Sequence, residues 1–136
     1  MKAKDFMLQV QEAEEELKLV AAKRRHFQDV MLSIGAKMSS TAVHASNNAS
    51  KTEIAAIGLW ETTKLLEEKE QEYVAMIKKA EELIAKLKQK KFRQVLTYRY
   101  MCNWSWKSIR DQMDYKDEKS VYRCHGYALK ELQKLM

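Results

Sequence analysis

Apolar residues recur along the first quarter of the chain in alternating steps of four and three. This heptad spacing is typical of a helix that packs along another helix. The positions are Phe6, Val10, Ala13, Leu17, Val20, Arg24, Phe27, Met31 and Ile34, with Arg24 as the one polar member. A second series with the same spacing comprises Leu59, Thr63, Leu66, Glu70, Tyr73, Ile77, Ala80, Ile84 and Leu87, widened by Trp60, Leu65, Met76 and Leu83. Two helices of roughly 30 residues, each ~45 Å long, are therefore predicted, most simply as an antiparallel hairpin.

The composition changes between the two heptad series, over residues 36–51. Ser, Thr, Asn and Ala replace the long charged side chains there and the heptad pattern stops, so we expect a loop or a mobile link. Ser50 and Glu53 match a capping box, which predicts that the second helix begins at Ser50. Residues 1–91 are thus expected to form a helical hairpin that serves as an oligomerisation or spacer region.

From residue 92 onward the chain is rich in aromatic side chains, which allow a compact core. Three short helices are predicted, at about 92–102, 105–113 and 118–135. Asn103 tolerates the left-handed conformation that ends a helix, while Ser105 and Asp117 can cap the helices that follow them. Two short helices followed by a longer one are typical of a helix-turn-helix domain. The expected fold is all-α, a long hairpin followed by a three-helix DNA-binding domain over residues 92–136.

The last predicted helix is amphipathic. Placed at 100° per residue, one face carries Val121, Cys124, Ala128, Leu132 and Leu135, and the opposite face carries Lys119, Tyr122, Arg123, Gly126 and Lys130. The apolar face would pack on the first two helices. The other face suits entry into a major groove, where Arg and Lys reach guanine edges or phosphates and Gly lets the backbones approach. An ordinary solvated helix face would carry a similar set of residues, so the pattern alone leaves both interpretations open.

A stretch near the C-terminus, SWKSIRDQMDYKDEKSVYRCHGYALKELQKL, resembles region 4 of bacterial sigma factors. It is similar in particular to the ArpU-type regulators that phages and prophages of Gram-positive bacteria encode. The matching positions are Ser105, which opens the first helix of the motif, Ile109 and Met113 at its packing positions, Val121 in the recognition helix, and Ala128, Leu129 and Leu132 in the closing Ala-Leu-x-x-Leu. The resemblance implies a sigma-region-4-like helix-turn-helix that binds double-stranded DNA and regulates transcription of phage or prophage genes.

The sequence departs from this family at several positions. Arg110 stands where a small residue is usual, Asp114 stands where a turn glycine is common, and the second turn is one residue longer. The residues at the family's DNA-reading positions are Glu118, Lys119, Tyr122 and Arg123, which implies a different recognition sequence. We expect Lys119, Tyr122 and Arg123 to reach base edges. Lys107, Arg110 and Lys130 would lie nearer the phosphates.

Composition and charge agree with this assignment. The chain has 136 residues, no proline and three glycines, which favours helices throughout. Of its net charge of +6, residues 92–136 contribute +4, from nine Lys and Arg residues against five Asp and Glu residues. A local basic excess attracts phosphate backbones. A helical hairpin could pair two such modules on one site, so we expect a homo-oligomer, most simply a dimer.

Several other classes are disfavoured by the sequence. The two cysteines do not provide a disulfide framework, and Cys102, Cys124 and His125 lack the spacing of a zinc site, so no metal or cofactor is expected. The acidic clusters lie in Lys-rich heptad helices, where ion pairs are the default, and we expect no enzyme. There is no signal peptide and no apolar run of the ~18 residues that cross a bilayer, so a cytoplasmic protein without a membrane partner is expected. Three alternatives remain: a protein that binds RNA polymerase or a sigma factor, a phage DNA-packaging subunit of the small-terminase kind, and a purely structural coiled coil.

Overall fold

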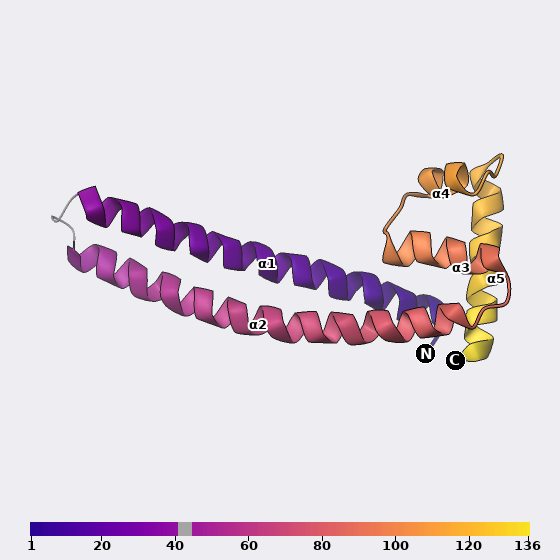
Figure 1. Cartoon of the computed structure of the whole chain (residues 1–136), viewed down its shortest axis with the longest axis horizontal. Coiled ribbons are helices and arrows are strands. Elements are labelled where there is room, and N and C mark those ends of the chain that lie inside the picture. Colours follow the sequence, from indigo (N-terminus) through magenta and orange to yellow (C-terminus); the bar gives the residue numbers. More distant parts are fainter. Residues whose placement is uncertain (41–44) are drawn as a thin grey trace. The chain divides into compact units, whose positions relative to one another are not determined.

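The computed structural model describes residues 1–40 and 45–136, with the side chains of residues 1–36 and 50–136. Each element in these two stretches is a helix (Figure 1). In chain order they are α1 (Ala3–Ser40), α2 (Ala45–Ala85), α3 (Lys90–Leu96), the π-helix η1 (Thr97–Met101), α4 (Trp106–Gln112) and α5 (Glu118–Leu135). The predicted all-α class is confirmed for the described residues.

The helices extend into the segment expected to be a loop at residues 36–51. α1 continues to Ser40 and α2 begins at Ala45, and the remaining residues 41–44 lie outside the described part of the chain. Ser50 lies inside α2, so the prediction that this helix begins with a capping box at Ser50 is wrong. The physical reason is that residues 36–51 contain no proline and no glycine. Ala is the best helix former, and Ser and Asn each cost only about 0.7 kcal/mol or less relative to it.

One compact unit, Glu15–Gln71, is an antiparallel pair made from parts of α1 and α2. Arg24 Nε donates a hydrogen bond of 2.9 Å to Thr63 Oγ1, and Lys69 Nζ lies 3.0 Å from Glu16 Oε2. The residue number rises along α1 as it falls along α2, which confirms the antiparallel pairing in this unit. Arg24, the polar member of the first heptad series, is accommodated because the second series places the Thr63 hydroxyl opposite it.

The two heptad series describe the buried seam correctly, with exceptions at its edge. Their members are buried or half-buried apart from Glu70, which is exposed. Trp60 and Leu65, expected to widen the buried stripe, are 64% and 38% exposed, so that prediction is wrong for both. A helix with a single partner buries a narrow stripe, and residues beside the stripe remain in solvent.

The other compact unit combines Met1–Glu14 with Glu72–Met136. Phe6, Met7 and Val10 of α1 lie in one core with buried residues of α2, α3, η1, α4 and α5. The Ala3 backbone N–H also donates a 2.6 Å hydrogen bond to Gln133 Oε1. The domain boundary expected at residues 91 and 92 therefore does not coincide with the compact units. A domain of about 45 residues buries too little apolar surface by itself, and here the N-terminal segment adds to its core.

The local structure of residues 90–135 follows the predicted three-helix pattern. α4 is capped by Ser105, whose Oγ accepts from Ser108 N–H at 3.2 Å, and α5 is capped by Asp117, whose Oδ1 accepts from Ser120 N–H at 2.9 Å. Asn103 has a φ of 57°, so its left-handed conformation is confirmed. The π-helical turn that ends the first of the three helices was not predicted, because its i to i+5 hydrogen bonds leave no periodic signature.

Candidate nucleic-acid interface

The buried face of α5 is packed against α3 and α4. Val121, Ala128 and Leu132 are fully buried and Cys124 is 5% exposed, as the helical wheel predicted. Leu135 is 41% exposed, so its assignment to the buried face is wrong. It is the last residue of the helix, and a terminal turn has fewer neighbours to cover it.

The opposite face of α5 is open to solvent. Lys119, Tyr122, Arg123 and Lys130 are exposed and Gly126 is half-buried. A Cβ atom added at Gly126 would meet nothing within 4 Å, so no packing contact in the described residues requires glycine there. The face therefore presents three cations and one phenol around a position with no side chain.

Tyr122 and Glu118 contact one another on this face. Tyr122 Oη donates a hydrogen bond of 3.1 Å to Glu118 Oε2, one helical turn earlier. This hydrogen bond is the main reason that the pKa of Tyr122 is raised above 10.0. The Tyr122 ring also lies edge-on to Trp106 of α4, with centroids 5.1 Å apart. Two contacts thus orient the Tyr122 side chain, and its hydroxyl oxygen retains the capacity to accept a hydrogen bond.

Trp106 lies at the centre of an aromatic cluster that supports α5. The Arg99 guanidinium carbon lies 4.2 Å from the centroid of the Trp106 ring, and the His125 ring lies edge-on to it at 4.9 Å. Tyr100 Oη and His125 Nε2 are 2.7 Å apart. Sequence reasoning did not assign a role to these four residues, although the density of aromatic side chains in this segment was the available signal. The cluster connects η1, α4 and α5.

His125 is neutral at physiological pH despite its place beside the basic face. Burial, together with the nearby charges of Lys4 and Arg99, lowers its pKa from 6.5 to about 4. A neutral ring can accept a hydrogen bond at Nε2 from the Tyr100 hydroxyl, which leaves the ring proton on Nδ1. His125 therefore acts in packing and hydrogen bonding, and the positive charge of this region comes from Lys and Arg.

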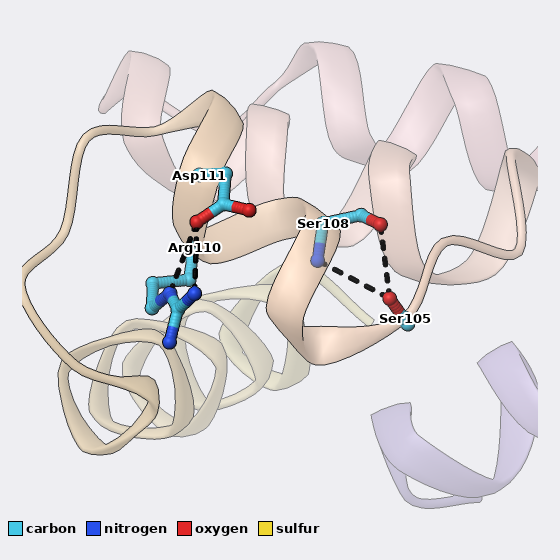
Figure 2. A network of polar contacts seen from close by, with 4 residues as sticks. All are labelled: Ser105, Ser108, Arg110 and Asp111. Carbon is cyan, nitrogen blue, oxygen red and sulfur yellow. Dashed lines mark hydrogen bonds and ion pairs between the residues drawn. The ribbon is translucent and has the colours of Figure 1, made fainter.

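Figure 2 shows the polar contacts of α4. At its start, Ser105 Oγ donates to Ser108 Oγ at 2.9 Å in addition to capping the helix. Near its end, Arg110 Nε and Nη2 lie 3.1 and 3.0 Å from Asp111 Oδ1, so the guanidinium lies along its own helix. Lys107 is exposed and Arg110 is half-buried. Of the eight residues predicted to bind DNA, the structure brings Glu118 and Tyr122 into direct contact, and it assigns Arg110 a carboxylate neighbour.

The turn between α4 and α5 contains the second left-handed residue of the chain's described part, Asp114, with a φ of 57°. Aspartate is one of the few residues with a side chain that tolerate this conformation, since its short polar side chain can bond locally. Asp114 therefore adopts a backbone conformation that glycine often provides in a turn.

The cysteines behave as packing or surface residues. Cys124 Sγ lies 3.7 Å from the Lys91 carbonyl oxygen, and burial raises the pKa of its thiol. Cys102 is exposed, and both thiols are free. Over residues 1–40 and 45–136 there is no group of three or more His, Cys, Asp or Glu side chains that could hold a metal ion. Within the same residues, no helix is both long enough and apolar enough to cross a membrane.

Comparison with known proteins gave no family model, curated protein or solved structure that matches this chain. The features of the described residues that bear on function are the exposed face of α5 and the side chains of α4 and η1 that support it.

Proposed function

We propose that this protein is a sequence-specific double-stranded DNA-binding transcription regulator in which α5 enters the major groove. The observation that carries the proposal is the two-sidedness of α5. Four buried side chains anchor one face, while Lys119, Tyr122 and Arg123 are exposed on the other beside the bare backbone of Gly126. The major groove admits a helix of this kind, and Arg and Lys are the side chains that most often bind guanine there.

The polar residues at the start of α5 would supply the specificity. Arg123 can donate two hydrogen bonds to the O6 and N7 atoms of guanine, and the Glu118 carboxylate can accept from the amino group of cytosine. Tyr122 already donates to Glu118, so its oxygen is available to accept from a cytosine or adenine amino group. This combination differs from the one in sigma factors and predicts a different operator.

Residues beside α5 would bind phosphates. In helix-turn-helix complexes the preceding helix crosses the DNA backbone, which on this assignment would bring Lys107 and Arg110 of α4 near phosphate oxygens. The contact of Arg110 with Asp111 is an exposed ion pair, and such pairs contribute little free energy, so a phosphate can compete for the guanidinium. Lys130, two turns after Arg123, would add a third phosphate contact.

The resemblance to ArpU-type regulators supports phage or prophage genes as the target. A single helix-turn-helix buries a small area on DNA, so pairing two modules in a homo-oligomer would raise the affinity without a new base contact. Host RNA polymerase or a sigma factor is a further partner that this role would allow.

The proposal is tested by binding of the full chain to fragments of its source DNA across a salt series, followed by sequencing of the fragments retained at physiological salt. Arg123→Ala should lower specific affinity by about 1–3 kcal/mol and relax selection at one base pair. Lys107→Ala should weaken binding to all sequences alike and reduce the slope of log affinity against log salt by about 1. Lys23→Ala, which removes an exposed lysine of α1, is the matched control and should change neither.

Two results would contradict the proposal. One is an Arg123→Ala protein that binds every sequence as the wild type does. The other is retention that disappears evenly with salt and leaves no selected fragment, in which case a protein partner for the exposed face of α5 replaces DNA as the explanation.

A further inference from the structure

A second apolar stripe runs along α2, beside the seam that packs on α1. Ile54 is 65% exposed, Ile57 is 57% exposed and Leu65 is 38% exposed. At 100° per residue the three fall within a sector of about 80°, with Glu61 between them. All of them belong to the unit Glu15–Gln71. We call Ile54, Ile57, Glu61 and Leu65 the α2 stripe.

The size of the α2 stripe is that of the centre of an interface. With Trp60 at its edge, it presents on the order of 400 Å² of apolar side-chain surface, which is the size of the largest apolar patch on a typical monomer, a patch that is often functional. A stable dimer buries about 800 Å² on each partner, with an apolar centre and a polar rim. The stripe can supply the centre, and the charged residues of α2 around it can supply the rim.

The charges at the two ends of the α2 stripe favour a second copy of the same chain as the partner. Lys51 lies one turn before Ile54, and Glu68 lies one turn after Leu65; both are exposed. An antiparallel second copy that places Ile54 opposite Leu65 also places Lys51 opposite Glu68. By two-fold symmetry each of these matches occurs twice. A parallel arrangement would instead oppose Lys51 to Lys51 and Glu68 to Glu68, which is unfavourable.

The surface beside Ile54 also suits this arrangement. Lys51 and Ile54 line a hollow of about 510 Å³ between α1 and α2, whose walls include Phe27, Val30 and Ile34. In the antiparallel arrangement the partner's Leu65 faces this end of the stripe, so an apolar side chain approaches the apolar part of a hollow that is also lined by His26, Asp29 and Ser33.

We propose that α2 forms a homodimer through the α2 stripe, antiparallel to its copy, with Ile54 opposite Leu65 and Lys51 opposite Glu68. The inference deepens the oligomer included in the proposed function by naming its surface and orientation. At the centre of this dimer, the Glu61 carboxylates of the two copies lie about one helical turn apart along the helix axis. Their repulsion weakens the dimer, so removal of this charge strengthens it.

The test is sedimentation of the full chain without DNA over a range of concentrations, with circular dichroism to verify that each variant is folded. Ile57→Glu should weaken dimerisation by about tenfold or more, whereas Leu32→Glu, a matched change at a 73% exposed position of α1, should not. Glu61→Gln should tighten the dimer several-fold. Lys51→Glu and Glu68→Lys should each weaken it, and the double exchange should restore it.

These results together test both the dimer surface and its antiparallel orientation. A wild-type chain that stays monomeric at its highest soluble concentration would overturn the proposal, and so would a dimer that Ile57→Glu leaves unchanged. Single charge changes without rescue in the double variant would overturn the antiparallel arrangement. Because DNA is absent from these measurements, their failure leaves the proposed DNA binding intact, and a failure of DNA binding leaves the dimer intact.

Discussion

Replacing Met7 by alanine tests whether the N-terminal segment belongs to the fold of the unit that carries α5. Met7 is fully buried, in one core with residues of α2, α3, η1, α4 and α5. The substitution removes the apolar part of a buried side chain and leaves a cavity, which in well-packed cores costs about 2–5 kcal/mol of unfolding free energy. Leu8→Ala is the matched control. It shortens the next side chain along α1, which is 38% exposed, and should cost less than about 1 kcal/mol.

Urea unfolding measures the difference in unfolding free energy between the two variants. Tryptophan fluorescence and far-ultraviolet circular dichroism monitor the transition. Trp104 and Trp106 report on the unit that contains Met7, whereas Trp60 lies in the other unit and is largely solvated in the folded state. With a denaturant slope of about 2 kcal/mol per molar, a loss of about 2–5 kcal/mol moves the midpoint for Met7→Ala by roughly 1–2.5 M. Equal midpoints for the Met7→Ala and Leu8→Ala proteins would refute the reasoning and restore residues 92–136 as an independent domain.

Three further predictions concern glycine and histidine. Gly58→Ala should destabilise the unit Glu15–Gln71, because its Cβ would lie 2.6 Å from carbons of the Phe27 ring. Gly35→Ala, with open space around it, should stabilise α1 by up to about 1 kcal/mol. Thermal unfolding compares the two proteins, and stabilisation of both would contradict the packing of Gly58 against Phe27. Gly126→Ala should stabilise α5 yet weaken DNA binding. An unchanged affinity for DNA would exclude a close approach of the α5 backbone to the DNA. His125→Gln should flatten the pH dependence of stability. Folding lowers the His125 pKa from 6.5 to about 4, so the unfolded chain binds this proton at a higher pH than the folded chain does. The stability of the wild type therefore falls as the pH is lowered from 6.5 to 4. Parallel wild-type and variant curves in urea titrations across that range would show that His125 is not the cause.

The sequence predicted those features whose physical cause is local or periodic. The heptad series predicted the seams of α1 and α2 because burial repeats with the helical period, and Arg24 opposite Thr63 is consistent with that register. Ser105, Asp117 and Asn103 were identified because capping and left-handed turns depend on the side chain at one position. The buried face of α5, apart from Leu135, followed from its wheel because burial repeats with the helical period.

Features that depend on contacts between distant segments could not be predicted in this way. Nothing in the heptad of residues 6–34 distinguishes Phe6 and Val10, which enter a core with α3, η1, α4 and α5, from Val20, which belongs to the other unit. The orientation of Tyr122 depends on Trp106, whose position is set by the packing of α4 against α5. Trp60 and Leu65 were assigned to the seam because their wheel positions lie beside it, and the width of a buried stripe depends on the partner.

The hydrogen bond from Ala3 to Gln133 joins positions 130 residues apart, which bears on the order in which this chain folds. Contacts so distant along the chain are slow to form by chance, because the intervening loop has to close first. The antiparallel register of α1 and α2 shortens that search. Once Glu16 and Lys69 are neighbours, the residues before Glu16 emerge beside those that follow Lys69. During synthesis, the hairpin can thus form early and hold residues 1–14 next to the start of residues 72–136, so that the last-made helix meets a partner that is already in place.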